Sequence, residues 1–387
     1  MTTTATATRT DRAWMERALE LARQGEALAS PNPMVGAVLV REGEELARGF
    51  HTYDGLLHAE VLALKDAGET APESGARGAT LYLNLEPCSH QGRTGPCVAA
   101  ILEAGVSRVV AAMADPNPQV NGRGFERLRA AGVEVMTGLC EDEARELNEA
   151  FACFMRLGRP LVTLKSGLTL DGKIAPGSIA LPGQHTWITS EESRAEVQRL
   201  RHASDAVLSG IGTVLADDPR LTDRSGRARR RPLLRVILDA GLRLPLDSQL
   251  VRTAQNDALV FCGEDVWLGK RRKLEERGVE VVEMKEAAGR ISLIAVLKRL
   301  AERQITGVLL EAGARLNAAA LEANLVDKVW LFFAPKFLGE DAVPLFAPTM
   351  HDARSTVHTP SLLRYRLHRF GPDFAVEGTL RDVYGNH

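Results

Sequence analysis

One histidine, one glutamate and two cysteines in the first quarter of the chain have the types and spacing of a catalytic zinc site. His58, Cys88 and Cys97 provide one imidazole and two thiolates, a set of three protein ligands that leaves a fourth position for water. Glu60 follows the histidine by two residues, where a carboxylate can carry a proton from that water to a leaving amine. His-x-Glu, then Pro-Cys and a second Cys, is the pattern of zinc deaminases that act on nucleobases. The four residues therefore predict hydrolytic deamination.

The spacing of the two cysteines separates this chain from the common deaminase pattern. That pattern has two residues between the cysteines, whereas eight residues, 89–96, stand between Cys88 and Cys97 here. The inserted loop contains His90 and Arg93, which we expect to overhang the metal. Such side chains suit the phosphate or the polar base edge of a nucleotide.

Three other interpretations of this region stay open at this point. His-Ala-Glu is a short motif that also occurs by chance, and cysteines near a turn are often small buried apolar residues. The chain could be a different zinc deaminase, acting on a free nucleoside or on RNA. It could also be a zinc-stabilised module without activity, in which His90 would complete the four protein ligands of a structural site.

The segments around these residues alternate between strands and helices over the first 157 residues. We expect a helix capped by Asp11, and we expect residues 1–10 to be a disordered tail. The further expected strands are 35–40, 80–85, 108–112 and 133–136, and the further expected helices are 59–67, 98–104, 125–131 and 141–157. This order predicts an α/β sandwich with helices on both faces of one sheet.

A second α/β domain follows the Gly158-Arg159-Pro160 break, which ends the last helix of the first domain. We expect it to span residues 160–387. Its expected strands are 161–165, 206–209, 234–238, 258–262, 307–310 and 328–333, with a helix near 292–303. A glycine-rich turn, 210–213, follows one of these strands and could bring backbone N–H groups to a phosphate.

The composition favours a cytoplasmic enzyme with a small-molecule substrate. The net charge of −2 argues against a nucleic-acid partner, which usually requires a basic face. No apolar run approaches the ~18 residues of a membrane span, and the Thr/Ala tract at the start lacks the apolar stretch of a secretory signal. The number of cysteines, five, is odd in a large chain, so a disulfide framework is not expected.

The motifs of the first domain resemble the bifunctional riboflavin biosynthesis deaminase-reductase family, and the resemblance runs from about Asp11 to about Gly378. The motifs that carry it here are Pro31-Asn32-Pro33, His51, His58-Ala59-Glu60, Glu86-Pro87-Cys88-Ser89-His90, Gly92-Arg93-Thr94, Pro96-Cys97 and Asp115-Pro116-Asn117. The resemblance implies a cytidine-deaminase-like α/β/α sandwich in which His58, Cys88 and Cys97 bind Zn²⁺ and Glu60 is the general acid/base. It also implies a substrate pocket lined by Asn32, His51, His90, Arg93, Asp115 and Asn117.

The second domain resembles the reductase half of the same family, which has a dihydrofolate-reductase-like α/β fold and uses NADPH. The resemblance places Arg201, Leu221, Arg224 and Glu311 at the substrate, with the arginines facing its phosphate. It places the cofactor beside Leu168, Thr169, Trp187, Thr189, Thr213, Asp217, Ala240 and Gly313, and it makes Lys165 and Asp171 supporting residues.

Together the two resemblances imply two consecutive steps of riboflavin biosynthesis. The first is deamination of 2,5-diamino-6-ribosylamino-4(3H)-pyrimidinone 5′-phosphate, and the second is reduction of the ribosyl group to a ribityl chain, in a homo-oligomer. Three residues depart from the family pattern: Thr169 replaces a serine, Ala312 replaces a glycine and Ala240 replaces a serine. A Cβ at residue 312 could crowd a pyrophosphate. The alternative is therefore an active deaminase whose reductase-like domain is impaired or only binds substrate.

Overall fold

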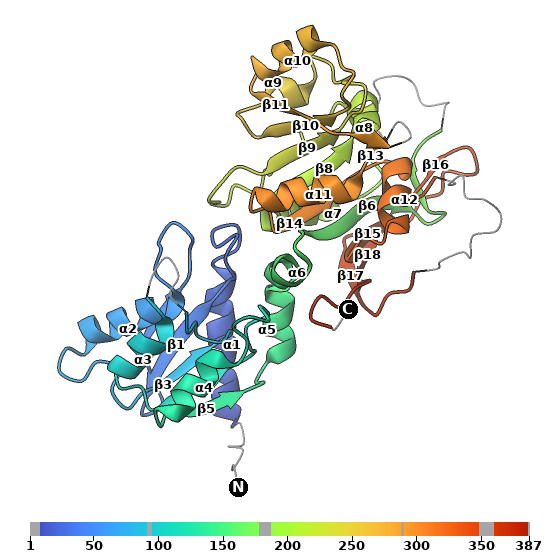
Figure 1. Cartoon of the computed structure of the whole chain (residues 1–387). Coiled ribbons are helices and arrows are strands. Elements are labelled where there is room, and N and C mark those ends of the chain that lie inside the picture. Colours follow the sequence, from blue (N-terminus) through green and yellow to red (C-terminus); the bar gives the residue numbers. More distant parts are fainter. Residues whose placement is uncertain (1–7, 91–94, 178–186, 288–289, 348–359, 386–387) are drawn as a thin grey trace. The chain divides into compact units, whose positions relative to one another are not determined.

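The computed structural model describes residues 8–90, 95–177, 187–287, 290–347 and 360–385. The chain separates into two compact units (Figure 1). The first runs to Leu157 and also includes Ala228–Arg230, and the second comprises Gly158–Arg227 and Arg231–Gly385. Among the described residues, no helix combines the length and the apolar character needed to cross a membrane.

A five-stranded mixed sheet forms the centre of the first unit, in the order β2-β1-β3-β4-β5. β1 is antiparallel to β2 and β3, whereas β3, β4 and β5 are parallel. The strands are β1 (Gly36–Arg41), β2 (Glu44–Phe50), β3 (Thr80–Leu83), β4 (Arg108–Ala111) and β5 (Glu134–Thr137). The helices are α1 (Arg9–Arg23), α2 (Ala59–Thr70), α3 (Cys97–Glu103), α4 (Arg123–Ala130), α5 (Glu141–Leu147) and α6 (Glu149–Leu157).

Two glycines show how closely helices pack on opposite faces of this sheet. A Cβ at Gly36 would lie 2.1 Å from the carbonyl oxygen of Ala18 in α1, and a Cβ at Gly49 would lie 2.6 Å from that of Ala59 in α2. In the antiparallel pairing Gly36 is opposite Phe50 and Gly49 is opposite Ala37, so the two glycines face opposite sides. The start of α2, which carries the predicted metal ligand and acid/base, can therefore lie directly on β2.

Two predictions for the first unit are wrong. The N-cap of α1 is Thr8 rather than Asp11; Asp11 accepts a hydrogen bond from the Thr8 backbone N–H and completes a capping box, so residues 8–10 do not belong to a disordered tail. The helix expected over 141–157 is two helices that meet at Asn148. The buried side chain of Asn148 bonds to the backbone of Met34, at 2.8 Å to its N–H and 3.1 Å to its carbonyl, and this contact is invisible to local sequence patterns.

The second unit is built on a nine-stranded sheet in the order β11-β10-β9-β8-β14-β6-β15-β18-β17. In this order, the seven strands from β11 at one edge through β15 are parallel to one another. β18 and β17 continue the sheet as an antiparallel hairpin. The strands are β6 (Leu161–Thr169), β8 (Ala206–Gly210), β9 (Leu234–Leu238), β10 (Ala258–Cys262), β11 (Val279–Glu283), β14 (Gly307–Leu310), β15 (Lys328–Ala334), β17 (Arg364–Phe370) and β18 (Asp373–Thr379).

Helices cover both faces of this second sheet. The helices are α7 (Glu191–Ala203), α8 (Ile211–Asp217), α9 (Gln249–Arg252), α10 (Leu268–Glu275), α11 (Leu293–Glu302) and α12 (Ala314–Glu322). One buried core joins the strands to α11 and α12, and residues that alternate with these along the strands join α8, α9 and α10 in a second core. Two short ladders complete the unit, β7 (Lys173–Ala175) with β16 (Val343–Pro344) and β12 (Glu286–Ala287) with β13 (Arg290–Ile291).

Candidate active sites

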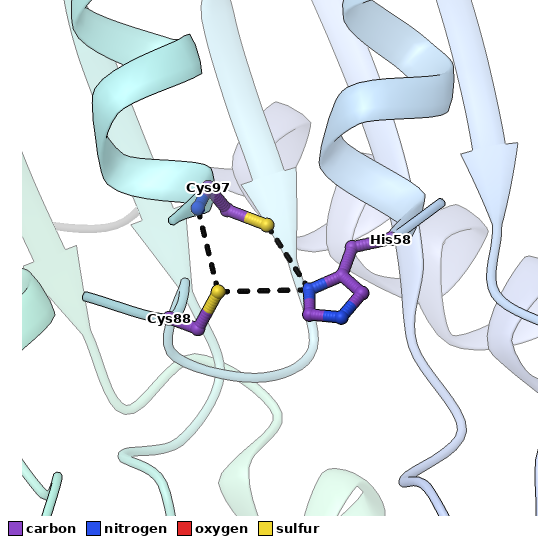
Figure 2. Close-up of side chains that lie close together, drawn as sticks. All are labelled: His58, Cys88 and Cys97. Carbon is purple, nitrogen blue, oxygen red and sulfur yellow. Dashed lines mark hydrogen bonds between the residues drawn. The ribbon is translucent and has the colours of Figure 1, made fainter. Parts of the chain in front are cut away.

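His58, Cys88 and Cys97 converge in the first unit, as Figure 2 shows. His58 is the N-cap of α2, Cys97 is the first residue of α3, and Cys88 lies in the loop after β3. The Nδ1 atom of His58 lies 3.1 Å from Sγ of Cys97 and 3.6 Å from Sγ of Cys88, and all three donor atoms lie within 4.8 Å of one another. Two helix starts and one strand end thus bring three residues from distant parts of the sequence to one point.

This donor set fits a zinc ion. Zn–N and Zn–S bonds of roughly 2.0 and 2.3 Å in a tetrahedron place the nitrogen and a sulfur about 3.5 Å apart, which agrees with the two observed N–S distances. Among the residues that the structure describes, no other His, Cys, Asp or Glu joins this group. His90, considered above as a fourth ligand, is exposed to solvent. Three ligands with one open position are typical of catalytic zinc rather than structural zinc.

The two thiols differ in acidity. Hydrogen bonding with Cys97, and also with His58, lowers the pKa of Cys88 to about 4, and the backbone N–H of Cys97 donates to its Sγ at 3.3 Å. The hydrogen bond to Cys88, together with burial, raises the pKa of Cys97. Because cysteines bind metals as thiolates, binding of a cation at this pair would release protons.

Glu60 is buried in the first turn of α2, with a relative exposure of 4%. Its carboxyl group lies close enough to hydrogen-bond with Cys97 and interacts electrostatically with His58. Burial raises the pKa of Glu60, and the charge of His58 offsets this effect only in part. A carboxyl that protonates readily beside the ligands is suited to accept and return a proton.

His51 and Asn32 form a polar pair next to the ligands. His51 is buried, its Nδ1 lies 2.9 Å from the carbonyl oxygen of Leu57, and its ring lies edge-on to the ring of His58 with 5.3 Å between centroids. Since a carbonyl can only accept, Nδ1 carries the proton, and Nε2 accepts from the amide of Asn32 at 2.9 Å. His51 therefore lies inside the domain, with both ring nitrogens engaged by protein groups.

Asp115 and Asn117 shape the loop that follows β4. Asp115 accepts the N–H of Asn117 at 2.8 Å, and Asn117 accepts the N–H of Gln119 at 3.0 Å, so both side chains stabilise turns. Burial raises the pKa of Asp115 to about 6, with further upward contributions from the charges of Glu86 and Cys88. The charge of His90 acts in the opposite direction and lowers the pKa of Asp115. Arg93 lies outside the described residues.

Sequence patterns missed Asn84, which positions the segment containing Asn32. Asn84 is fully buried, accepts the N–H of Gly36 at 2.9 Å and donates to the carbonyl of Met34 at 2.9 Å. Together with Asn148 it fixes the backbone just after Asn32. The available signal was an asparagine directly after an apolar strand, which is too common to identify a role.

In the second unit, Lys165, Arg201 and Glu311 form a buried ionic cluster. Arg201 donates to both carboxylate oxygens of Glu311, at 2.6 and 3.1 Å, and Nζ of Lys165 lies 3.2 Å from the same carboxylate. Burial raises the pKa of Glu311, but the charges of Arg201 and Lys165 outweigh it and lower the pKa to about 2. The cluster brings the ends of β14, α7 and the middle of β6 together.

Arg224 adds a further cation beside this cluster. Burial lowers the pKa of Arg224, as do the nearby charges of Arg201 and Arg220, and Glu311 compensates only in part. Arginines that repel one another around a single carboxylate have a local excess of positive charge, which is suited to an anion. Arg201 also donates to the carbonyl of Thr222 at 3.0 Å. The side chain of Leu221 packs in a buried core, so it leaves only the main chain of that residue for a substrate.

Thr169 and Asp171 build one turn. Oγ1 of Thr169 donates to Asp171 at 2.5 Å and accepts the N–H of Lys173 at 3.0 Å, while Asp171 accepts the N–H groups of Leu338 and Gly339. Leu168, which precedes the turn, is buried. Thr169 therefore uses its hydroxyl within the protein, and Asp171 ties the end of β6 to the segment after β15.

Trp187 and Thr189 belong to the segment before α7, in which Trp187 is exposed and Thr189 is half-buried. Trp187 is 63% exposed, and the guanidinium of Arg194 lies 4.8 Å from its ring centroid. The methyl group of Thr189 would lie 3.2 Å from a Cβ at residue 167. Sequence patterns missed Lys336, whose Nζ donates to the carbonyls of Trp187 and Ile188 at 3.2 and 2.7 Å and so holds this segment.

Thr213 and Gly313 face each other near the starts of α8 and α12, because a Cβ at Gly313 would lie 3.8 Å from Oγ1 of Thr213. Within the described part of the chain, no heavy atom outside the helix's own backbone lies within 4 Å of where a Cβ of Gly212 would be, which leaves room for a ligand beside this backbone. Such a glycine-lined space fits a dinucleotide phosphate. Asp217 is the exposed last residue of α8, and Ala240 follows β9, where its carbonyl accepts the N–H of Gly263.

Comparison with known proteins supports both halves. The RibD C-terminal domain family matches residues 160–374, and the cytidine and deoxycytidylate deaminase zinc-binding region matches residues 8–113. The riboflavin biosynthesis protein RibD of Escherichia coli (strain K12) is 41% identical over 369 residues, which cover 94% of this chain and 97% of that protein. The RibD of Aquifex aeolicus (strain VF5) is 44% identical over 330 residues, which cover 85% and 88%.

Solved structures agree with this result. Acinetobacter baumannii RibD aligns with a TM-score of 0.81 at 37% identity, covering 97% of this chain and 99% of that one. A diaminohydroxyphosphoribosylaminopyrimidine deaminase/5-amino-6-(5-phosphoribosylamino)uracil reductase from Thermotoga maritima aligns with a TM-score of 0.80 at 35% identity, covering 96% and 99%. The cytidine-deaminase-like fold of the first domain and the dihydrofolate-reductase-like fold of the second are thus confirmed. This chain belongs to the RibD family of riboflavin biosynthesis proteins.

Proposed function

We propose that the two activities of this riboflavin biosynthesis enzyme, deaminase and reductase, are divided between its domains as the two sites suggest. The first domain would remove the 2-amino group of 2,5-diamino-6-ribosylamino-4(3H)-pyrimidinone 5′-phosphate by hydrolysis. The second would then reduce the ribosyl group of the product to a ribityl chain with a hydride from NADPH. The observation that carries the proposal is the open three-donor site with a buried carboxyl group beside it.

In the first domain, His58, Cys88 and Cys97 would hold the zinc ion. When bound, zinc supplies an activated water at near-neutral pH. Glu60 would take a proton from that water and pass it to the leaving amine, which departs as ammonia. Asn32 and His51 would face the base edge, since an amide and a neutral imidazole offer both donors and acceptors. Asp115, Asn117, His90 and Arg93 would complete the pocket.

In the second domain, Arg201 and Arg224 would bind the phosphate of the deaminated product, and Glu311 and Lys165 would orient it. NADPH supplies the hydride when bound. Leu168, Thr169, Trp187, Thr189, Thr213, Asp217, Ala240 and Gly313 would surround the cofactor. The protein would hold the reacting carbon of the ribose close to the nicotinamide and in the orientation that hydride transfer requires.

An impaired reductase domain is the second candidate function, because Ala312 replaces a glycine of the family pattern. In this structure Ala312 packs against the core that α11 and α12 share with the sheet. A methyl group directed at the core does not narrow the space at the adjoining Gly313. The observation therefore favours an active reductase over the impaired one.

One assay separates these candidates. The purified zinc-loaded enzyme would receive the diamino-ribosylamino-pyrimidinone phosphate with and without NADPH, while ammonia release and NADPH absorbance are followed together. We expect both signals, with NADPH oxidation dependent on prior deamination, and loss of both in Glu60→Gln. The Glu60→Gln enzyme should still oxidise NADPH when given the deaminated product. Ammonia without NADPH oxidation would support the impaired-reductase candidate, and no ammonia from zinc-loaded enzyme would contradict the proposed substrate.

We further propose that the enzyme is a homo-oligomer that works in the cytoplasm, where NADPH and phosphorylated substrates are available and thiols stay reduced. The second sheet has an exposed apolar face at its antiparallel edge: Tyr365, Leu367 and Phe374 are 65%, 67% and 40% exposed, and Phe374 stacks on Phe333. Sedimentation of Leu367→Lys beside an Ile294→Lys control, at an exposed residue of α11, tests this. Unchanged mass for Leu367→Lys would exclude this face as the interface.

A further inference from the structure

We propose that Glu86 is a positioning residue of the deaminase site: its carboxylate couples the turn that carries the metal ligand Cys88 to the loop that carries Asp115. This inference rests on the deaminase site proposed above and adds a role that the ligand pattern itself does not contain. Glu86 stands two residues before Cys88, is 5% exposed and does not belong to the three-donor group.

The carboxylate of Glu86 accepts three backbone hydrogen bonds from one loop. Oε2 accepts the N–H of Asp115 at 3.0 Å and that of Gly122 at 2.8 Å, and Oε1 accepts the N–H of Gly124 at 2.8 Å. Hydrogen bonds to an ionised acceptor are the strong kind. The two ends of the loop 115–124 are therefore fixed on a single side chain.

Glu86 also takes the place of a helix cap. The N-cap of α4 is Gly122, which has no side chain and adopts a φ of 80°, and helix α4 has no capping side chain of its own. From a segment more than 30 residues earlier, the Glu86 carboxylate accepts the N–H of the N-cap Gly122 and that of Gly124, the second residue of α4, and its negative charge lies at the positive end of the helix dipole. The start of α4 and the ligand turn are thereby held at a fixed separation.

Close backbone packing strengthens this connection. A Cβ at Gly124 would lie 2.2 Å from the carbonyl oxygen of Pro87, so α4 lies directly against the residue between Glu86 and Cys88. On the other side of Cys88, Arg127 of α4 donates to the carbonyl of Ser89 at 2.6 Å. Cys88 therefore lies between two contacts with α4, one at Pro87 and one at Ser89, and the hydrogen bonds that Glu86 accepts add a third connection to the start of the same helix.

The proposal predicts a joint defect in metal retention and substrate binding when the carboxylate is lost. Glu86→Gln keeps the shape but can accept with only one oxygen, so at least one N–H of the loop loses its partner. Residues that orient metal ligands typically change metal affinity or activity about 10- to 100-fold. We expect Glu86→Gln to release zinc to a competing chelator about tenfold faster and to raise the deaminase KM about tenfold, with a smaller change in kcat.

Two controls distinguish positioning from a general loss of stability. Asp11→Asn removes a carboxylate of similar burial, 3% exposed, that Arg108 and Tyr82 bind at the opposite end of the strands. It should lower the melting temperature without altering zinc release or KM. Reductase activity on the deaminated product, measured in the same full-length chains, should equal that of the unsubstituted enzyme in both variants.

The outcomes can be told apart from a failure of the proposed function. If the unsubstituted enzyme releases no ammonia, the proposed substrate is wrong, whereas zinc release from Glu86→Gln still tests the coupling. Zinc release and KM within twofold of the unsubstituted enzyme in Glu86→Gln would overturn the proposal. If Glu86→Gln does not fold, Asn121→Ala replaces it, since the exposed side chain of Asn121 donates to the carbonyl of Asp115 at 2.9 Å and so holds the same loop. It should raise KM about threefold; an unchanged KM would then contradict the proposal.

Discussion

Neutralising Glu311 should destabilise the second domain strongly at neutral pH and weakly in acid. The ordinary pKa of a glutamate, 4.5, falls to about 2 at Glu311 in the folded protein. At about 1.36 kcal/mol for each pKa unit, the ionised carboxylate contributes about 3 kcal/mol to folding. Because the folded pKa is depressed, this contribution is complete above pH 4.5 and disappears as the pH falls toward 2. Glu311→Gln, which leaves Arg201 and Lys165 facing each other without an anion, should lose about the same amount.

Scanning calorimetry of the full-length protein measures this loss. The transition of the second domain is identified as the one that NADP⁺ shifts upward. For a domain of this size about 3 kcal/mol corresponds to a fall of roughly 6–12 °C in melting temperature at pH 7. The difference between Glu311→Gln and the unsubstituted protein should shrink as the pH is lowered from 5 to 3.

Glu280→Gln is the matched control for this prediction. Glu280 pairs with Arg303 in the same domain, but its side chain is 51% exposed, and exposed pairs contribute about 0–1 kcal/mol. We expect a fall of no more than a few degrees, with little dependence on pH. If Glu311→Gln melted within 2 °C of Glu280→Gln at pH 7, or if its deficit were the same at pH 7 and pH 3, the assignment of the stabilising charge to Glu311 would be wrong.

Three further predictions concern the metal, the phosphate and the break between α5 and α6. Removing zinc with a chelator should lower the melting temperature of the first domain alone, since the donor group found among the described residues lies in that domain; an equal shift of both transitions would count against a zinc site there. Arg224→Gln should raise the reductase KM about tenfold at low salt and less at high salt, measured by NADPH oxidation; a salt-independent effect would argue against phosphate binding. Asn148→Ala should cost about 2 kcal/mol in urea unfolding of the first domain, because the backbone N–H of Met34 loses the acceptor that Asn148 provides; a loss below 0.5 kcal/mol would contradict this role.

The zinc ligands could be predicted from the sequence because each lies at a recognisable boundary of an element. His58 and Cys97 start helices and Cys88 follows a strand, and helix starts and strand ends have local signals. Short apolar strands were equally accessible: 234–238, 258–262 and 307–310 begin and end as predicted. Their buried residues are continuous, which is typical of a parallel sheet covered on both faces.

Elements that depend on distant partners could not be predicted in this way. β17 alternates arginines with apolar residues and is mostly exposed, so its strand character depends on pairing with β18 rather than on burial. The break at Asn148 depends on Met34, which lies 114 residues earlier. In the same way, Glu86 was visible as part of the Glu-Pro-Cys motif, but its three N–H partners lie 29 to 38 residues later, and no local pattern indicates that they meet its carboxylate.

The glutamates show most clearly what a residue type leaves undetermined. Glu60 and Glu311 both have buried carboxyl groups, and burial alone would raise the pKa of each. The pKa of Glu60 stays raised because the charge of His58 offsets the effect of burial only in part. At Glu311 the charges of Arg201 and Lys165 outweigh burial, so the pKa is lowered instead. A carboxyl that gains a proton easily can serve as an acid/base, and one that keeps its charge can only orient cations or a substrate. The different roles of two identical side chains therefore follow from neighbours that the fold brings from 110 and 146 residues away at Glu311.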